Sequence, residues 1–252
     1  MKSLGGIRLT SSKVIEKGLP FDRRWMLVDE NHVFMTQRVY PAMALIKLSM
    51  QESSFKVTFE KTSIELSFAQ QHEPEPILTQ VWDDPVTTYE VSPQHSQWFS
   101  QQLGVTCKLV CFPEDESRPV DADHALHGEH VSLADGYPFL IIGTESLNDL
   151  NGRLQTPVPM NRFRPNFVFT GGVPYEEDSW RKFRIGNNQF MGVKPCGRCV
   201  MTTVNQDTAE KGFEPLLTLS KYRKTGASVL FGQNVIAIDH NEIHEGDEIS
   251  FE

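Results

Sequence analysis

Three short runs of alternating apolar and polar residues constrain the fold of this chain more than any other feature. Their apolar positions are Ile46, Leu48, Met50, Phe55, Val57, Phe59, Ile64, Leu66 and Phe68. A period of two places alternate side chains on opposite faces of a strand, and polar turns separate the runs. The pattern therefore predicts an antiparallel sheet with one buried and one solvated face.

The rest of the chain continues as many short strands with a few short helices, so the predicted fold class is mainly β. Further strands are predicted at residues 25–28, 33–35, 79–82, 138–142, 166–170, 183–185, 189–193, 199–204 and 235–238, with a turn at 83–85. Helices are predicted at 94–103 before Gly104, at 145–154 with Thr144 as the cap, and at 215–222.

A polar segment at 112–131 is predicted to be a long surface loop. It carries His124, His127 and His130 at every third position. Because no regular element holds these histidines together, we interpret them as solvated side chains rather than as metal ligands.

The chain has 252 residues and a formal net charge of −9. This length suits one large domain or two small ones. The negative charge argues against binding a nucleic-acid polymer through its phosphates, although arginines gathered at one place can still bind a single anion. No apolar run is long enough to span a membrane, and the first residues lack the apolar core of a secretory signal. Four cysteines in such a chain do not indicate a disulfide framework, so we expect a cytoplasmic protein.

The sharpest local motif is Lys194-Pro195-Cys196-Gly197-Arg198-Cys199-Val200-Met201-Thr202-Thr203. A zinc site needs four ligands, and the spacing of Cys107 and Cys111 makes a poor second pair. A thioredoxin-like dithiol needs a helix start, whereas the residues after Cys199 are β-branched and strand-like. The neighbouring cations favour a single reactive thiolate. From spacing alone, one reactive thiolate in this pair and two inert buried cysteines stay equally open.

Arginines form two other clusters. One is Asn161-Arg162-Phe163-Arg164-Pro165-Asn166, just before a predicted strand. The other joins Arg23 and Arg24 to Arg38 across a predicted hairpin. Guanidinium groups bind phosphates and carboxylates in forked geometry. Taken alone, the first cluster is better explained as a solvated strand edge than as an anion site. The second could equally form structural ion pairs with Asp22 or face one anion.

A set of short motifs follows in a characteristic order along the chain. They are Lys2-Ser3, Asp22-Arg23, Thr36-x-Arg38, Leu133-Ala134-Asp135-Gly136-Tyr137-Pro138, Phe163-Arg164-Pro165-Asn166, Glu177-Asp178-Ser179-Trp180, Pro195-Cys196-x-Arg198-Cys199-x-x-Thr202-Thr203-Val204 and Phe231-Gly232-Gln233-Asn234. In this order the motifs resemble MOSC-domain proteins of the YcbX type. The family also includes relatives of the mitochondrial amidoxime-reducing component and of the molybdenum cofactor sulfurase C-terminal domain.

The resemblance implies an N-terminal β domain over residues 1–94 and a MOSC β-barrel with a few short helices over residues 95–252. The family usually has a first strand before the Lys-Ser pair. We therefore expect the N-terminal sheet to lack a strand, to expose an edge and to leave Lys2 and Ser3 prone to fraying. Asn205-Gln206-Asp207-Thr208-Ala209 replaces the family's Asp-Pro-Asp-Thr-Gly, which changes the turn chemistry of that loop.

The resemblance also implies a site for molybdenum cofactor, a pterin dithiolene that carries a phosphate. Cys199 would be the molybdenum ligand and, with Asp135, the catalytic pair, while Cys196 would be the less essential cysteine. The residues expected to line the cofactor pocket are Lys2, Ser3, Arg23, Arg38, Gly136, Tyr137, Arg164, Asn166 and Arg198. Pyridoxal phosphate binding is a further term associated with the family.

The implied function is an oxidoreductase that reduces N-hydroxylated small molecules such as hydroxylaminopurines or amidoximes. Since the sequence has no four-cysteine iron–sulfur motif, electrons are expected from a separate flavin- or haem-containing reductase. The alternative is a sulfur carrier or transferase in which Cys199 holds a persulfide.

Overall fold

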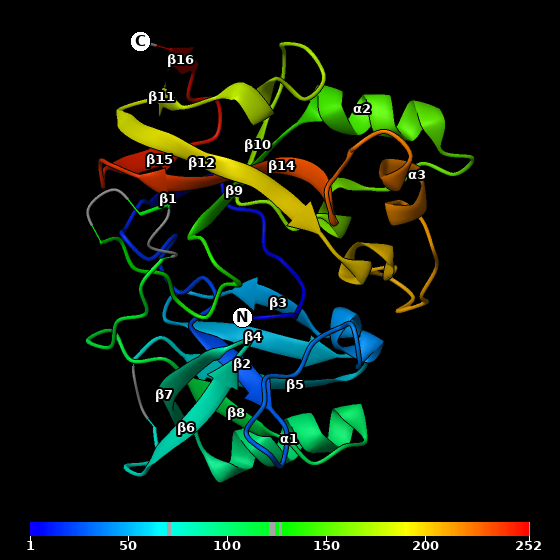
Figure 1. The fold of residues 1–252 in the computed structure, drawn as a ribbon. Helices are drawn as coiled ribbons and strands as arrows, with labels where there is room; N and C mark the ends of the chain where they lie inside the picture. Colours follow the sequence, from blue (N-terminus) through cyan, green and yellow to red (C-terminus); the bar gives the residue numbers. More distant parts are fainter. Residues whose placement is uncertain (70–71, 121–123, 126–127, 252) are drawn as a thin grey trace.

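The computed structural model describes residues 1–69, 72–120, 124–125 and 128–251 and is mostly β, which confirms the predicted fold class. Figure 1 shows two stacked halves. The lower half holds β2 to β8 with helix α1, and the upper half holds β9 to β16 with α2 and α3. The N-terminus lies between the halves, close to both.

The lower half contains two antiparallel sheets. One has the order β2-β8-β7-β6, with bounds Trp25–Val28, Lys108–Cys111, Asp84–Glu90 and Pro76–Val81. The other is the meander β3-β4-β5 over Lys47–Met50, Ser54–Phe59 and Thr62–Ser67, which confirms the three alternating runs. Helix α1, Pro93–Leu103, packs Phe99 into the core and ends at Gly104 with φ 69°, as predicted.

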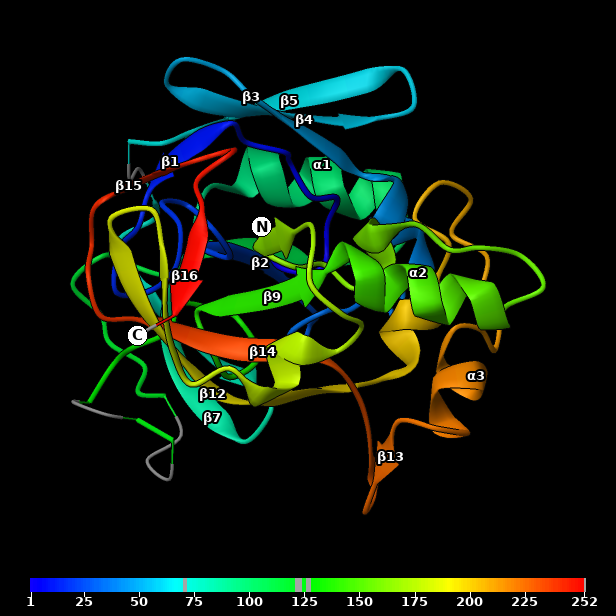
Figure 2. The same ribbon diagram turned by 90° about the horizontal axis from the view of Figure 1, so that it is seen from above.

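The upper half is built on a seven-stranded sheet, and helices α2 and α3 lie near the same end of it (Figure 2). Its path is β10 (Phe167–Phe169), β9 (Phe139–Gly143), β14 (Ser228–Ala237), β12 (Asn188–Arg198), β11 (Lys182–Ile185) and β16 (Ile249–Phe251), with β13 (Lys224–Thr225) paired to β14. Helices α2 (Thr144–Arg153) and α3 (Leu216–Ser220) lie against it. Apolar clusters form on both sheet faces, as expected for a covered sheet.

Two connections cross between the halves. Strand β1, Ser11–Lys13, pairs with β15, Glu242–His244, so an early segment completes the upper half. Helix α1 begins at Pro93 and spans the predicted boundary, and both it and strand β8 pack in the lower half. The division at residues 94 and 95 stays a prediction.

The expected open edge of the N-terminal sheet is partly occupied. The Lys2 backbone N–H donates to the Trp25 carbonyl at 2.8 Å, and the Met35 N–H donates to the Leu27 carbonyl at the same distance. Lys2 and Ser3 are 4% and 5% exposed. The expectation that Lys2 and Ser3 would fray is therefore wrong, because these backbone bonds and the surrounding core hold them.

The segments around the paired cysteines differ from their predicted strands. Residues 189–193 belong to the long strand β12, which runs on through Arg198, and 200–203 form a 3-10 turn instead of a strand. The Thr202 and Thr203 hydroxyls donate to the carbonyls of Cys199 and Val200, at 3.0 and 2.8 Å. Threonine bonds to nearby carbonyls compete with sheet pairing, which explains the difference.

Three smaller predictions also need correction. Residues 33–35 make isolated bridges rather than a strand. The turn predicted at 83–85 lies at Trp82 and Asp83, and β7 begins at Asp84. Pro85 is tolerated there because it pairs with β6 alone, while β7 meets β8 only near its far end.

The third correction concerns α2, which begins without a threonine cap. The Thr144 hydroxyl donates to the Phe169 carbonyl at 2.7 Å instead. Residues 121–123 and 126–127 of the predicted loop, with His127, lie outside the described residues. Among the described ones, His130 Nδ1 lies 2.6 Å from Glu16.

Replacing Ala209 by glycine is expected to stabilise the fold. Ala209 has φ 60°, at the place where the resembling family has glycine. A left-handed conformation costs a non-glycine residue about 1–2 kcal/mol, and the greater flexibility of unfolded glycine offsets roughly half of this. Denaturant unfolding should show a gain of about 0.5–1 kcal/mol. Ala42→Gly, at a residue without positive φ, should lower stability; a gain in both variants would contradict the argument.

Candidate functional site

Strand β12 is shaped so that its end carries the cysteine pair out of the sheet. Its pairing with β14 shifts register between Gly192 and Lys194 and again between Pro195 and Gly197. Such bulges bend a strand and re-aim its side chains, and they accommodate a proline that has no N–H to donate. Cys196 consequently packs against an apolar cluster of the upper half, whereas Cys199 follows the strand and lies at the start of the 3-10 turn.

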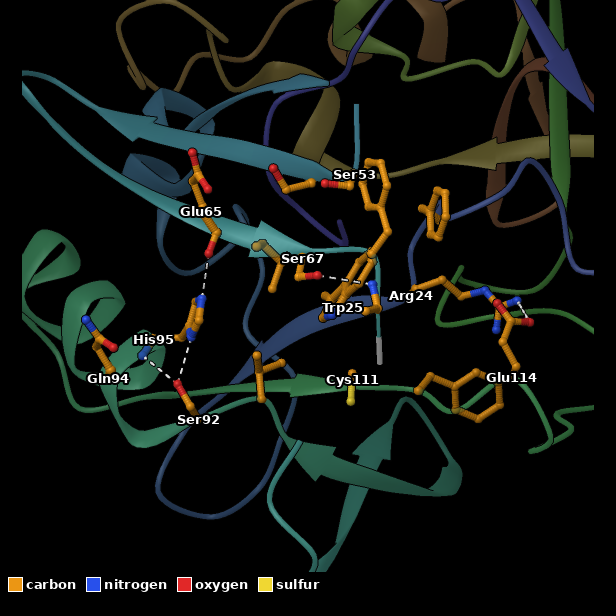
Figure 3. Close-up of a pocket in the computed structure, with 17 residues that line it drawn as sticks. Arg24, Trp25, Ser53, Glu65, Ser67, Ser92, Gln94, His95, Cys111 and Glu114 are labelled. Carbon is orange, nitrogen blue, oxygen red and sulfur yellow. Dashed lines mark hydrogen bonds and ion pairs between the residues drawn. The ribbon is translucent and has the colours of Figure 1, made fainter. Parts of the chain in front are cut away.

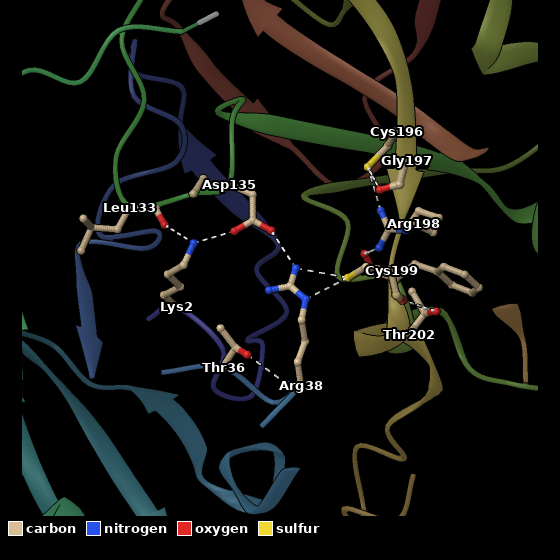
Figure 4. A network of polar contacts seen from close by, with 12 residues as sticks. Lys2, Thr36, Arg38, Leu133, Asp135, Cys196, Gly197, Arg198, Cys199 and Thr202 are labelled. Atoms are coloured by element: carbon tan, nitrogen blue, oxygen red, sulfur yellow. Dashed lines mark hydrogen bonds and ion pairs between the residues drawn. The ribbon is translucent and has the colours of Figure 1, made fainter. Parts of the chain in front are cut away.

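Cys199 is joined to the lower half by Arg38 (Figure 4). The Nε and Nη2 atoms of Arg38 donate to Cys199 Sγ at 3.3 and 3.2 Å. Arg38 Nη2 also lies 3.5 Å from the Asp135 carboxylate, and Lys2 Nζ donates to the other Asp135 oxygen at 2.6 Å. The fold thus brings four predicted residues from distant segments into one polar network: Lys2, Arg38, Asp135 and Cys199.

The charged groups of this polar network shift one another's pKa values. Burial alone would raise the pKa of Asp135, but the charge and hydrogen bond of Lys2, the charge of Arg38 and a hydrogen bond from Trp82 hold it well below its usual range. Burial lowers the pKa of Lys2 to about 8, although Asp135 opposes the shift. Asp135 is 53% exposed along its side chain, so a fixed negative charge faces solvent beside the sulfur.

A second group of predicted residues surrounds Asp22. Arg23 pairs with its carboxylate, and Asn166 Nδ2 donates to it at 2.9 Å. Arg164 Nη1 donates to the Leu4 carbonyl at 2.7 Å, and Arg23 Nη2 donates to the Arg164 carbonyl at 3.4 Å. Burial, followed by the charge of Arg23, lowers the pKa of Arg164 to about 10.

The arginines here outnumber the carboxylates that accompany them. Arg198 Nη1 donates to Cys196 Sγ at 3.0 Å and Nη2 to the Phe163 carbonyl at 2.6 Å, but the buried Arg198 Nε has no hydrogen-bond partner. Arg162 Nη1 is buried and unpartnered in the same way, and burial lowers the pKa of Arg162. Unsatisfied buried guanidinium nitrogens are costly, so this arrangement suits an added anion.

Backbone strain marks the same region. Ser3, Arg23 and Arg164 have φ values of 61°, 51° and 58°. Such conformations are uncommon outside glycine and are typical of functional sites. Three predicted pocket residues therefore adopt a geometry that local sequence does not favour.

The remaining predicted residues lie nearby in less direct roles. The Ser3 carbonyl accepts a 2.8 Å bond from Gln37, and Lys194 Nζ lies 5.2 Å from the centre of the Tyr137 ring. Gly136 is partly buried beside Asp135.

Sequence reasoning missed Trp82 and the buried pair Gln37 and Gln206. In that pair, Gln206 Nε2 donates to Gln37 Oε1 at 2.8 Å and links the two halves. Only the departure of residues 205–209 from the resembling family pointed toward that loop.

A separate cavity of about 580 Å³ lies in the lower half (Figure 3). It is bordered by Trp25, Phe68, His95 and Cys111 and contains none of the predicted site residues. Both ring nitrogens of His95 are already bonded, to Ser92 and to the Glu65 carbonyl. Burial raises the pKa of Cys111 to about 11, which fits an inert thiol.

The described part of the chain contains neither a cluster of metal ligands nor a membrane-spanning helix. No group of three or more His, Cys, Asp and Glu side chains there is placed to hold a metal ion by itself. None of the helices in these ranges is long and apolar enough to cross a bilayer.

Two family models match the chain in succession. The MOSC N-terminal beta barrel domain matches residues 1–106, and the MOSC domain matches residues 128–250. The chain is 30% identical to mitochondrial amidoxime-reducing component 1 of Mus musculus, over 99% of this chain and 78% of that protein. The Homo sapiens protein of that name is also 30% identical, with 99% and 79% covered.

The molybdenum cofactor sulfurase of Oryza sativa subsp. japonica is 30% identical over 98% of this chain but only 32% of its own length. The chain thus spans about a third of that relative. Two domain models match in the expected order, and a relative 30% identical aligns with almost the whole of this chain. These matches establish its family. The chain belongs to the MOSC-domain family, and its MOSC domain follows a MOSC N-terminal β-barrel domain.

Proposed function

We propose that this protein binds molybdenum cofactor with Cys199 as the protein ligand of molybdenum and reduces N-hydroxylated small molecules. The observation that carries the proposal is a set of partly buried arginines near one partly exposed cysteine. Arg38 bonds the cysteine sulfur, and Arg162 and Arg198 each have a buried nitrogen without a partner. The relatives named for amidoxime reduction support the reductase over other molybdenum-linked roles.

The residues present fit such a group in charge and in donor chemistry. A thiolate is a suitable ligand for a thiophilic metal, and it must lose its proton to bind. Arg38 would stabilise the sulfur anion through its two N–H donors. Arg162, Arg164 and Arg198 would meet the anionic phosphate of the cofactor by charge-assisted bonds.

The cofactor, when bound, supplies two-electron oxygen-atom chemistry, and the protein supplies binding and orientation. An N-hydroxyl group takes two electrons and two protons and leaves as water, so that an amine or amidine remains. Asp135 stays ionised and half-exposed, so it can accept a hydrogen bond from a substrate N–H and hold the reacting nitrogen near Cys199. Lys2 and Arg38 fix that carboxylate from behind.

The electrons are proposed to come from a separate flavin- or haem-containing reductase. All four cysteines are free, which agrees with the reducing, cytoplasmic setting that we propose.

A sulfur carrier is the second candidate, because relatives named molybdenum cofactor sulfurase match most of this chain. In that case Cys199 would hold a persulfide, whose terminal anion Arg38 would stabilise. Mass spectrometry of freshly isolated protein tests this directly. A one-sulfur adduct on Cys199 without bound pterin would favour the carrier.

The reductase is tested with the full chain reconstituted with molybdenum cofactor and a chemical or protein reductant. We expect hydroxylaminopurine or benzamidoxime to be converted to the amine or amidine, with about one molybdenum per chain. Bound molybdenum with no reduction of any N-hydroxylated compound by any competent reductant would contradict the reductase.

A further inference from the structure

Trp82 occupies a strained position beside the site. Val81 pairs with Asp84, so Trp82 and Asp83 form a two-residue hairpin turn between β6 and β7. The φ of Trp82 is 57°. Turns of this length favour glycine, asparagine or aspartate at positions with positive φ, and a bulky aromatic residue there is an outlier. Backbone strain of this kind concentrates at binding and catalytic sites, so the function of this side chain needs an explanation.

The indole ring is held against the residues that touch Cys199. Arg38 Cζ lies 4.4 Å from the ring centre and covers one face, while Arg38 also donates to Cys199 Sγ. The centre of the Phe34 ring lies 5.1 Å from that of the indole, with the two planes at 65°, and Arg38 Nη2 also lies 3.5 Å from the Asp135 carboxylate. The ring therefore lies one guanidinium group away from the sulfur.

Much of the ring nevertheless stays open to solvent. Trp82 is 44% exposed, whereas Trp25 and Trp180 are 5% and 6% exposed in apolar clusters. A single exposed aromatic ring is not unusual by itself, but this one also sits in a strained turn and carries Arg38 on its face. Arg38 thus connects the sulfur with two exposed groups, a flat apolar ring and the carboxylate of Asp135.

We propose that Trp82 is a specificity-determining wall of the substrate site, against which flat aromatic N-hydroxylated compounds stack. This inference rests on the proposed reductase function and names its preferred substrate class. A planar heterocycle stacked on the indole can place an exocyclic N–H toward Asp135 and its N-hydroxyl group toward the metal ligand. Aliphatic N-hydroxylated compounds have no face to stack, so they gain nothing from this wall.

A merely structural role for Trp82 makes a different prediction. If the ring only positions Arg38, its loss will lower the turnover of every substrate by a similar factor. If the ring stacks substrate, its loss will raise KM for aromatic substrates and leave aliphatic ones almost unchanged. The ratio of the two substrates therefore distinguishes the roles.

The experiment uses the cofactor-loaded full chain with 6-N-hydroxylaminopurine and acetamidoxime. Trp82→Gly is the main variant, because glycine suits the positive φ and preserves the turn. We expect KM for the purine to rise about tenfold to a hundredfold, as for the loss of a base-stacking aromatic, with little change for acetamidoxime. Trp82→Phe should restore most of the loss, and Trp98→Leu, in helix α1, is the matched control. Equal loss on both substrates would overturn the proposal.

A second readout does not depend on turnover. Quenching of indole fluorescence by 6-N-hydroxylaminopurine should be saturable in the wild-type chain and should largely disappear in Trp82→Phe. Saturable quenching that is identical in both proteins would also overturn the proposal. A wild-type protein that reduces neither compound but shows Trp82-dependent quenching would contradict the reductase while supporting the aromatic wall.

Discussion

Substituting Cys199 by serine is expected to remove molybdenum from the reconstituted protein and to lower N-reductive activity by more than about a hundredfold. Mutating a residue that merely supports a metal ligand already lowers metal affinity or activity by about ten- to a hundredfold, so loss of the ligand itself should cost more. A serine hydroxyl is a hard ligand that stays protonated near neutral pH, whereas a cysteine thiol ionises readily. Elemental analysis gives the metal content, and pterin fluorescence after oxidation gives the cofactor content.

The matched control is Cys196→Ser, three residues earlier in the same chain. Cys196 packs against the upper apolar cluster and bonds Arg198 rather than Arg38. We expect this variant to keep its molybdenum and most of its activity, with only a modest loss of stability. If both variants kept the metal equally, Cys199 would not be the ligand, and the reductase and carrier proposals would both lose their central residue.

The second large effect is expected at Asp22, whose loss leaves Arg23 and Arg164 close together without their carboxylate. Breaking a buried ion pair costs about 3–5 kcal/mol. Asp22 and Arg23 are 25% and 19% exposed along their side chains, so we expect Asp22→Asn to lose about 3 kcal/mol of unfolding free energy, the lower end of that range. Urea unfolding at neutral pH measures it, with Asp115→Asn as an exposed control.

The pH dependence gives the same prediction an independent check. Burial is the largest single influence and would raise the pKa of Asp22. Nearby positive charge, that of Arg23 first, and hydrogen bonds from Asn166 and Arg23 together hold the pKa below its ordinary value. A depressed pKa stabilises the folded state above the unfolded pKa of about 4, and this contribution disappears as the pH falls through the folded pKa. The stability gap between wild type and Asp22→Asn should therefore narrow from pH 5 toward pH 2. A gap independent of pH would mean that the charge is not the cause.

Much of the fold follows from local patterns in the sequence. The alternating runs at 46–68 and the helix that ends at Gly104 were predicted because period and end signals are local. The errors occur where side chains bond their own backbone or where distant segments compete. Thr202 and Thr203 turn a β-branched stretch into a 3-10 turn.

The candidate site shows the same division. Family resemblance identified Lys2, Arg38, Asp135 and Cys199, and the fold brings these residues into one network of contacts. Their chemical roles stay predictions. Residue spacing could not place Trp82 there, since its importance arises from a turn conformation and from Arg38 lying on its ring. The bond between Gln37 and Gln206 joins segments far apart in sequence, and only the folded chain reveals it.

The pairing of β1 with β15 has a consequence for how such proteins can be recombined. A graft of residues 128–250 alone would carry β15 into its new host but leave behind Ser11–Lys13, the segment that completes its edge. The unsatisfied N–H and C=O groups would then invite pairing with other chains. Exchange of the MOSC domain between relatives is thus expected to preserve function only when the segment that contains β1 is transferred with it. The two matched regions therefore behave as a single unit in recombination.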